Sequence, residues 1–165
     1  MKGNVMGKTQ IEAPEGLPFT EMTREFDAPR DLVFRAYTDP ELLVQWLGPR
    51  KYTMKVEAWE PRDGGRWRYT HSDEDNVYAF HGVFHGDQSP DGMLQTFEFD
   101  GAPGHVSLEK VVFEERDGKT LMRNSSVYQS ISARDAMIDS GMEEGVNDGY
   151  DRLDELLAKL REPVA

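Results

Sequence analysis

The last periodic segment of the chain constrains the fold most. Between residues 142 and 160, apolar residues recur every three or four positions, which is the pattern of an amphipathic helix. Acidic residues fill the other face. The apolar stripe consists of Met142, Val146, Tyr150, Leu153, Leu156, Leu157 and Leu160. Because this is the one long apolar stripe in the sequence, the predicted helix has to cover the sheet that the rest of the chain forms.

The middle of the chain alternates between apolar and polar residues, which is typical of strands. The predicted strands cover residues 52–60, 65–72, 76–87, 93–100, 105–116 and 119–129. Turn residues such as Asp63-Gly64-Gly65 and Asp117-Gly118 separate them. The short spacing predicts a meander of antiparallel neighbours.

The segment before this meander predicts one strand and two short helices. Residues 19–26 alternate as a strand does. Asp27-Ala28-Pro29 and Asp39-Pro40 are helix starts, and Gly48-Pro49 ends the second helix. Residues 132–139 are expected to form one or two helical turns.

This order of elements predicts an α+β fold in which a curved antiparallel sheet wraps around a long C-terminal helix. We expect a single domain over residues 17–162, because the chain of 165 residues has the length of one ordinary domain. Residues 1–16 lack a periodic pattern and are predicted to be a flexible leader.

Composition excludes several kinds of site and partner. The chain has no cysteine, which rules out disulfides and thiolate chemistry and fits a cytoplasmic protein. The formal net charge of -12 disfavours nucleic acid as a partner, because phosphate backbones repel an acidic protein. No apolar run approaches the roughly 18 residues needed to span a bilayer, so we expect no membrane insertion.

Several motifs occur together in one order. They are Phe26-Asp27-Ala28-Pro29, Thr38-Asp39-Pro40-Glu41, Gln45-Trp46-Leu47-Gly48-Pro49, Arg62-Asp63-Gly64-Gly65-Arg66-Trp67-Arg68, Tyr78-Ala79-Phe80-His81-Gly82-Val83-Phe84 and the segment 140–157. Together they resemble the heat-shock-protein-90 ATPase activator homologue-like family of the SRPBCC or START superfamily, which includes the birch pollen allergen. The resemblance implies a helix-grip fold with a deep apolar pocket between the sheet and the long helix. It does not imply one activity.

The candidate ligand-binding residues are mostly aromatic or apolar. They are Trp46, Trp67, Tyr69, His71, Phe80, Phe97, Met142, Val146, Gly149 and Tyr150. Strict alternation puts Trp67, Tyr69 and His71 on one face of a strand. Gly145 and Gly149 lie next to the helical stripe, where they allow a backbone or a ligand to approach closely.

Titratable residues in the strands are expected to face solvent. We expect His71 to lie open to water at its strand end, and Glu57, Glu98 and Glu109 to point outward. If any of these side chains instead faces an apolar cavity, it becomes a candidate for ligand hydrogen bonding or acid–base chemistry, with a shifted pKa.

No metal or other cofactor is expected. His81 and His85 share one face of a predicted strand roughly 13 Å apart, which is too far for them to share an ion.

The preferred hypothesis is binding of a small hydrophobic or aromatic molecule, as a carrier, sensor or scavenger, without catalysis. One alternative is an enzyme of the cyclase, dehydratase or hydrolase type that uses a cavity histidine or glutamate. The other is a co-chaperone-like module that binds a protein. The sequence leaves open whether the chain forms a homodimer.

Overall fold

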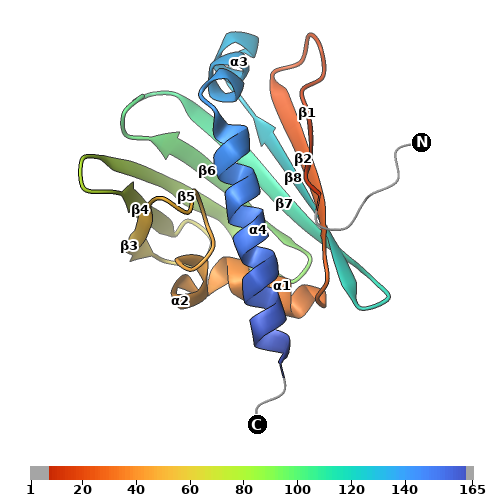
Figure 1. The fold of residues 1–165 in the computed structure, drawn as a ribbon. Helices are drawn as coiled ribbons and strands as arrows, with labels where there is room; N and C mark the ends of the chain where they lie inside the picture. The colour runs from red at the N-terminus through yellow and green to blue at the C-terminus, as the bar shows by residue number, and fades with distance from the viewer. Residues whose placement is uncertain (1–7, 163–165) are drawn as a thin grey trace.

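The structure is a computed structural model that describes residues 8–162. A curved antiparallel sheet forms one layer, and a long helix, α4, lies across its inner face (Figure 1). The strands are β1 Gln10–Glu12, β2 Phe19–Phe26, β3 Thr53–Trp59, β4 Arg66–Ser72, β5 Val77–Ser89, β6 Gly92–Phe99, β7 Val106–Arg116 and β8 Lys119–Val127. The helices are α1 Arg30–Thr38, α2 Pro40–Leu43, α3 Ile131–Asp139 and α4 Met142–Arg161. The strand order is β1-β2-β8-β7-β6-β5-β4-β3.

The predicted α+β fold with a sheet around a C-terminal helix is confirmed. One strand was missed. Gln10–Glu12 forms β1 and pairs with β2, so the prediction of a flexible leader over residues 1–16 is wrong for this part. Three residues are too few to show alternation, but the free edge of β2 offers backbone groups that a short strand can satisfy. Residues 1–7 of the predicted leader lie outside the described residues.

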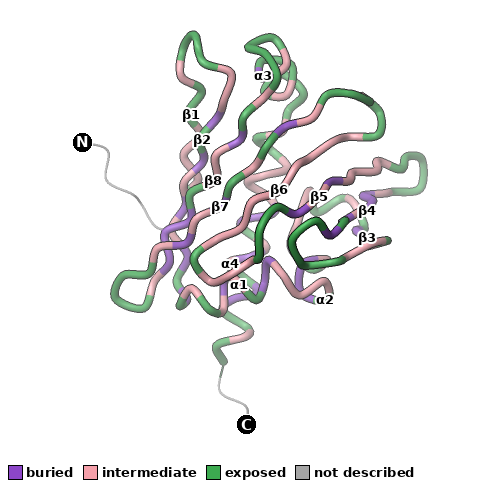
Figure 2. Tube along the Cα trace, turned by 180° about the vertical axis from the view of Figure 1, so that it is seen from behind, coloured by how far each residue is buried: buried purple, intermediate pink, exposed green. Residues whose placement is uncertain are grey.

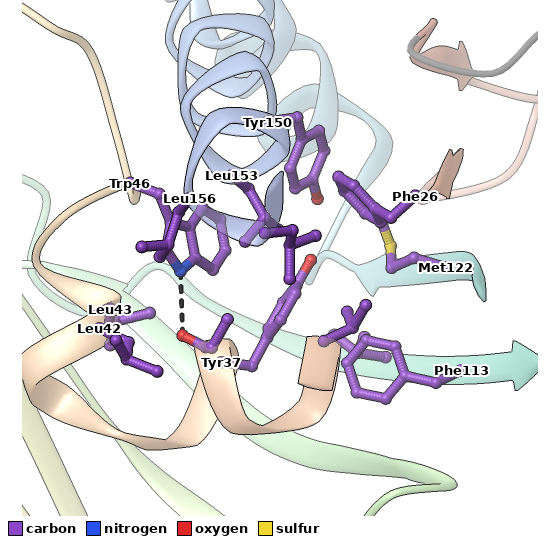
Figure 3. Packing of buried hydrophobic residues seen from close by; sticks show 14 of the residues in the cluster. Phe26, Tyr37, Leu42, Leu43, Trp46, Phe113, Met122, Tyr150, Leu153 and Leu156 are labelled. Atoms are coloured by element: carbon purple, nitrogen blue, oxygen red, sulfur yellow. Dashed lines mark hydrogen bonds between the residues drawn. The ribbon is translucent and has the colours of Figure 1, made fainter. Parts of the chain in front are cut away.

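The second helix is shorter than predicted. It ends at Leu43, and residues 44–47 continue as turns. Trp46 is buried in this turn, and its indole N–H donates to the backbone oxygen of Ala36 at 2.9 Å (Figure 3). Gly48 then adopts a positive φ of 91°, which reverses the chain toward β3.

The core lies under the second half of α4. In that half, Tyr150, Leu153, Leu156 and Leu157 are buried, whereas in the first half Met142 and Val146 are only half-buried. Figure 3 shows Leu153, Leu156 and Tyr150 pointing toward side chains of the first helix, its following turn and the sheet. Seen from behind, the exposed residues gather in the hairpin loops at the rim of the sheet (Figure 2). The first turns of α4 therefore leave part of the inner face without core packing.

A buried arginine joins α4 to the sheet. Arg24 on β2 is 2% exposed, and its Nη2 donates to Asp151 at 2.9 Å and to Asp154 at 2.5 Å. Its guanidinium carbon lies 5.7 Å from the ring centre of Phe26 and 5.8 Å from that of Tyr150. Two carboxylates and two aromatic rings thus compensate the buried charge.

We predict that Leu153→Ala destabilises the fold by about 2–5 kcal/mol, because it removes a fully buried leucine from the centre of this contact. Chemical denaturation measures the loss. Lys159→Ala, at an exposed position of the same helix, serves as the control and should change stability by less than about 0.5 kcal/mol. A loss below about 1 kcal/mol for Leu153→Ala would contradict the packing described here.

Candidate functional site

A cavity of about 540 Å³ lies between the inner face of the sheet and the first turns of α4. Its lining residues come from α4, from the turn after α2, from strands β2 to β8 and from the three shorter helices. This volume is within the range of pockets that hold small organic ligands. The cavity occupies the region where α4 lacks core contacts.

The structure brings all ten candidate residues to this cavity. Trp46, Trp67, Tyr69, His71, Phe80, Phe97, Met142, Val146, Gly149 and Tyr150 all line it. Ligand binding by these residues stays a prediction, since their position alone does not show it.

One side of the cavity is an aromatic wall formed by Trp67, Tyr69, Phe80 and Phe97. Ring centres are 5.1 Å apart for Trp67 and Tyr69, 5.5 Å for Tyr69 and Phe80, and 5.4 Å for Phe80 and Phe97. These separations are typical of interacting aromatic pairs. A methyl group at Gly82 would lie 2.6 Å from the indole nitrogen of Trp67, so this glycine makes room for the ring.

His71 is buried, and the expectation that it lies open to water is wrong. Its residue is 7% exposed, because the turn after α2 packs over the strand end: a methyl group at Gly48 would lie 2.5 Å from the imidazole. Burial, with a smaller contribution from Arg152, lowers the pKa of His71 to about 4. The ring is therefore neutral near pH 7. Its Nδ1 has no hydrogen-bond partner within residues 8–162.

Glu109 also faces the cavity, which corrects the expectation that it points to solvent. It lies on β7 directly between Gln95 of β6 and Ser126 of β8. Burial raises the pKa of Glu109 to about 7. Glu57 and Glu98 lie elsewhere, the first 3.1 Å from Arg68 and the second 3.5 Å from His81.

A pattern in the sequence could have placed Glu109. It shares its strand face with Ser107, Val111 and Phe113, and all three are buried. Alternation with a buried aromatic residue therefore predicts the inward position of Glu109 better than the polarity of its side chain does.

Other polar residues that sequence reasoning missed surround Glu109. This polar floor consists of Tyr37, Gln95, Glu109, Asn124, Ser126 and Tyr128. Burial raises the pKa of Tyr37 well above its ordinary value and that of Tyr150 to about 12, so both hydroxyls keep their protons. The two side chains face one another across the core (Figure 3). The cavity therefore combines an aromatic wall with a floor that can exchange hydrogen bonds.

The helix glycines make room for the protein's own turn. A methyl group at Gly149 would lie 3.1 Å from the backbone nitrogen of Gly48 and 3.2 Å from the backbone oxygen of Trp46. At Gly145 it would lie 3.2 Å from the ring of Pro49. The sequence left open whether a backbone or a ligand approaches here. At Gly149 the close neighbour is a backbone, and the contact holds the turn as one wall of the cavity.

In residues 8–162, no group of three or more histidine, cysteine, aspartate or glutamate side chains could hold a metal ion. No helix there is long and apolar enough to cross a membrane.

Solved structures share this architecture. A Rhodobacter sphaeroides protein is 27% identical, with a TM-score of 0.84 over 92% of this chain and 99% of that one. A Mycobacterium smegmatis protein is 25% identical, with a TM-score of 0.82 over 90% and 95% of the two chains. An AHSA1-like protein from Aeromonas hydrophila shares the fold at 16% identity, with a TM-score of 0.67 over 88% and 98%. No curated protein matches the chain.

The sequence itself carries the family relationship, which agrees with the motifs and with the arrangement of sheet and helix. Residues 27–158 match the description "Activator of Hsp90 ATPase homolog 1-like protein". This match runs from the turn after β2 almost to the end of α4 and includes the residues that line the cavity, except Met22 on β2. The chain therefore belongs to the Activator of Hsp90 ATPase homolog 1-like family, with the helix-grip fold of the SRPBCC proteins.

Proposed function

We propose that this protein binds a small hydrophobic or aromatic molecule in the cavity under α4 and acts as a carrier, sensor or scavenger. The observation that carries the proposal is a cavity of about 540 Å³ beside an otherwise close-packed core. Protein interiors seldom keep voids much larger than a water molecule, because each void loses dispersion contacts and stability. The family's fold, which generally has a ligand cavity, supports the proposal.

Polar groups without partners also support a ligand. The Trp67 indole nitrogen and His71 Nδ1 are buried at the cavity and lack hydrogen bonds within the described residues. An unsatisfied buried polar group costs about 1–3 kcal/mol. A mostly apolar ligand with a polar group would satisfy one or more of them.

One observation favours the enzyme alternative. A carboxyl with a pKa of about 7 is suited to proton transfer near neutral pH, and Glu109 has this property inside the cavity. If a co-purifying molecule is identified, its conversion by the parent but not by Glu109→Gln would establish the enzyme.

The co-chaperone alternative rests on the name of the family. A cytoplasmic location and the absence of a nucleic-acid partner stay predictions.

We predict that N-phenyl-1-naphthylamine, a neutral aromatic probe, binds with micromolar affinity and gains fluorescence. It should also raise the melting temperature, because a ligand that binds only the native state at a hundred times its Kd stabilises by about 2.7 kcal/mol. Native mass spectrometry of protein taken directly from its host is expected to show a bound small molecule. The absence of both probe binding and a co-purifying molecule would contradict the proposal.

We predict that Val146→Trp abolishes probe binding, because Val146 is half-buried on the α4 wall and a larger side chain there fills the cavity. Val127→Trp provides the matched control, since Val127 is 45% exposed and outside the cavity lining. Gln95→Phe fills the cavity from the sheet side, so the test does not depend on one variant folding. A folded Val146→Trp or Gln95→Phe protein that binds the probe as tightly as the parent would place the site elsewhere.

A stability measurement tests the environment of Glu109. Its pKa is about 7 in the folded state against 4.5 ordinarily, so the native state holds the proton more tightly than the unfolded chain does. The stability that this tighter proton binding adds is fully present below pH 4.5, decreases as pH rises and is lost above pH 7. As pH rises from 4.5 to 7, the free energy of unfolding of Glu109→Gln should therefore increase relative to that of the parent by up to about 3 kcal/mol. A difference that stays constant with pH would show that Glu109 is solvated.

A further inference from the structure

We propose that the cavity selects an apolar organic cation, such as a hydrophobic amine or a quaternary ammonium compound, held between the Glu109 carboxylate and the aromatic wall. The inference rests on the proposed function and narrows its ligand class. It depends on the charges around Glu109 and on the position of the aromatic rings.

Glu109 has no positive partner in the described part of the chain. The buried guanidinium of Arg24 is already paired with Asp151 and Asp154. Arg152 donates to the backbone oxygen of Gly48 at 3.3 Å, beside His71. Lys51 is exposed and also lines the cavity, and its ammonium lies 5.2 Å from the ring centre of Tyr52. The cavity therefore offers a carboxyl group whose counter-charge the protein does not supply.

The titratable groups that face Glu109 from the other elements are neutral. They are four tyrosines whose pKa burial raises, with a smaller contribution from Glu109: Tyr37 on α1, Tyr69 on β4, Tyr128 after β8 and Tyr150 on α4. With His71 neutral as well, nothing in this group compensates an ionised Glu109. A carboxylate in an apolar cavity is costly without a cation, and an entering ammonium group offsets that cost.

The aromatic wall lies next to the carboxylate. Glu109 pairs across the sheet with Gln95, and Phe97 is the next residue on the same face of β6. Phe97 is in ring contact with Phe80 and with Trp67, at 5.4 Å and 5.9 Å between ring centres. Aromatic faces attract cations, more strongly when water is excluded, and cages of this composition recognise quaternary ammonium groups.

The charge of the whole chain acts in the same direction. A formal net charge of -12 attracts cations toward the protein and repels anions. An acidic ligand would be repelled both by this net charge and by the Glu109 carboxylate. A neutral ligand would leave Glu109 protonated and act only as a hydrogen-bond partner.

Cation binding is coupled to the protonation of Glu109. The carboxyl must ionise to pair with an ammonium group, and its pKa without ligand is about 7. Below that pKa, each pH unit should weaken amine binding about tenfold, whereas a neutral ligand should show no such dependence. Alkylammonium groups, like lysine with an ordinary pKa of about 10.4, remain charged throughout this range.

Three probes with one ring system test the inference: 2-(naphthalen-2-yl)ethylamine, 2-(naphthalen-2-yl)ethanol and 3-(naphthalen-2-yl)propanoate. Calorimetry at pH 8 should give the amine a Kd at least about tenfold lower than the alcohol, with the carboxylate weakest. With the Glu109 pKa at about 7, the amine preference should shrink about fivefold between pH 7 and pH 6. In Glu109→Gln, the ratio of amine to alcohol affinity should fall to about one. In Glu21→Gln, an exposed position on β2, the ratio should equal that of the parent.

The outcomes separate this inference from the proposed function. If the parent binds the alcohol but binds the amine no more tightly, the cation preference is overturned and the proposed function stands. If Glu109→Gln keeps the full amine preference, the carboxylate is not its source and the inference is overturned. If the parent binds none of the three probes, the inference is overturned, and N-phenyl-1-naphthylamine binding together with native mass spectrometry decides the proposed function.

Discussion

The packing of the second half of α4 against the turn after α2 and the sheet is the contact on which the rest of the structure depends. Leu153 and Leu157 are fully enclosed there, and Arg24 adds two ion pairs from β2. This contact fixes the direction of α4 over the sheet. Because a straight helix cannot follow a curved surface along its whole length, the first half of α4 lies over a gap. The cavity is thus a consequence of where the helix is anchored.

The turn after α2 connects this core to the cavity. Trp46 holds it through the bond to Ala36, and the absence of a side chain at Gly149 lets its backbone reach α4. The same turn covers His71 and lowers the pKa of that imidazole by burial. One short segment therefore contributes to the core, closes a cavity wall and determines the protonation of a cavity side chain.

The interior carries electrostatic costs that a purely structural core would avoid. Glu109 is held where its charge has no partner, and the Trp67 indole nitrogen and His71 Nδ1 have no hydrogen bonds within the described residues. Apolar substitutions of similar volume at such sites are often neutral or stabilising. Buried polar groups that are left unsatisfied in a cavity are therefore more readily explained by a ligand than by folding.

The sequence by itself determined the element order, the antiparallel meander, the covering helix and the ten residues that reach the cavity. It could do so because helix and strand periods record which residues share a face, and because Pro29 and Asp39 mark helix starts. It did not reveal β1, the early end of α2, the burial of His71 or the inward position of Glu109. Alternation tells which residues lie together but not which face of the sheet is concave, and a polar residue does not disclose its burial. Only the tertiary structure decided these points, because curvature, the position of α4 and the turn over His71 arise from contacts between segments distant in the chain.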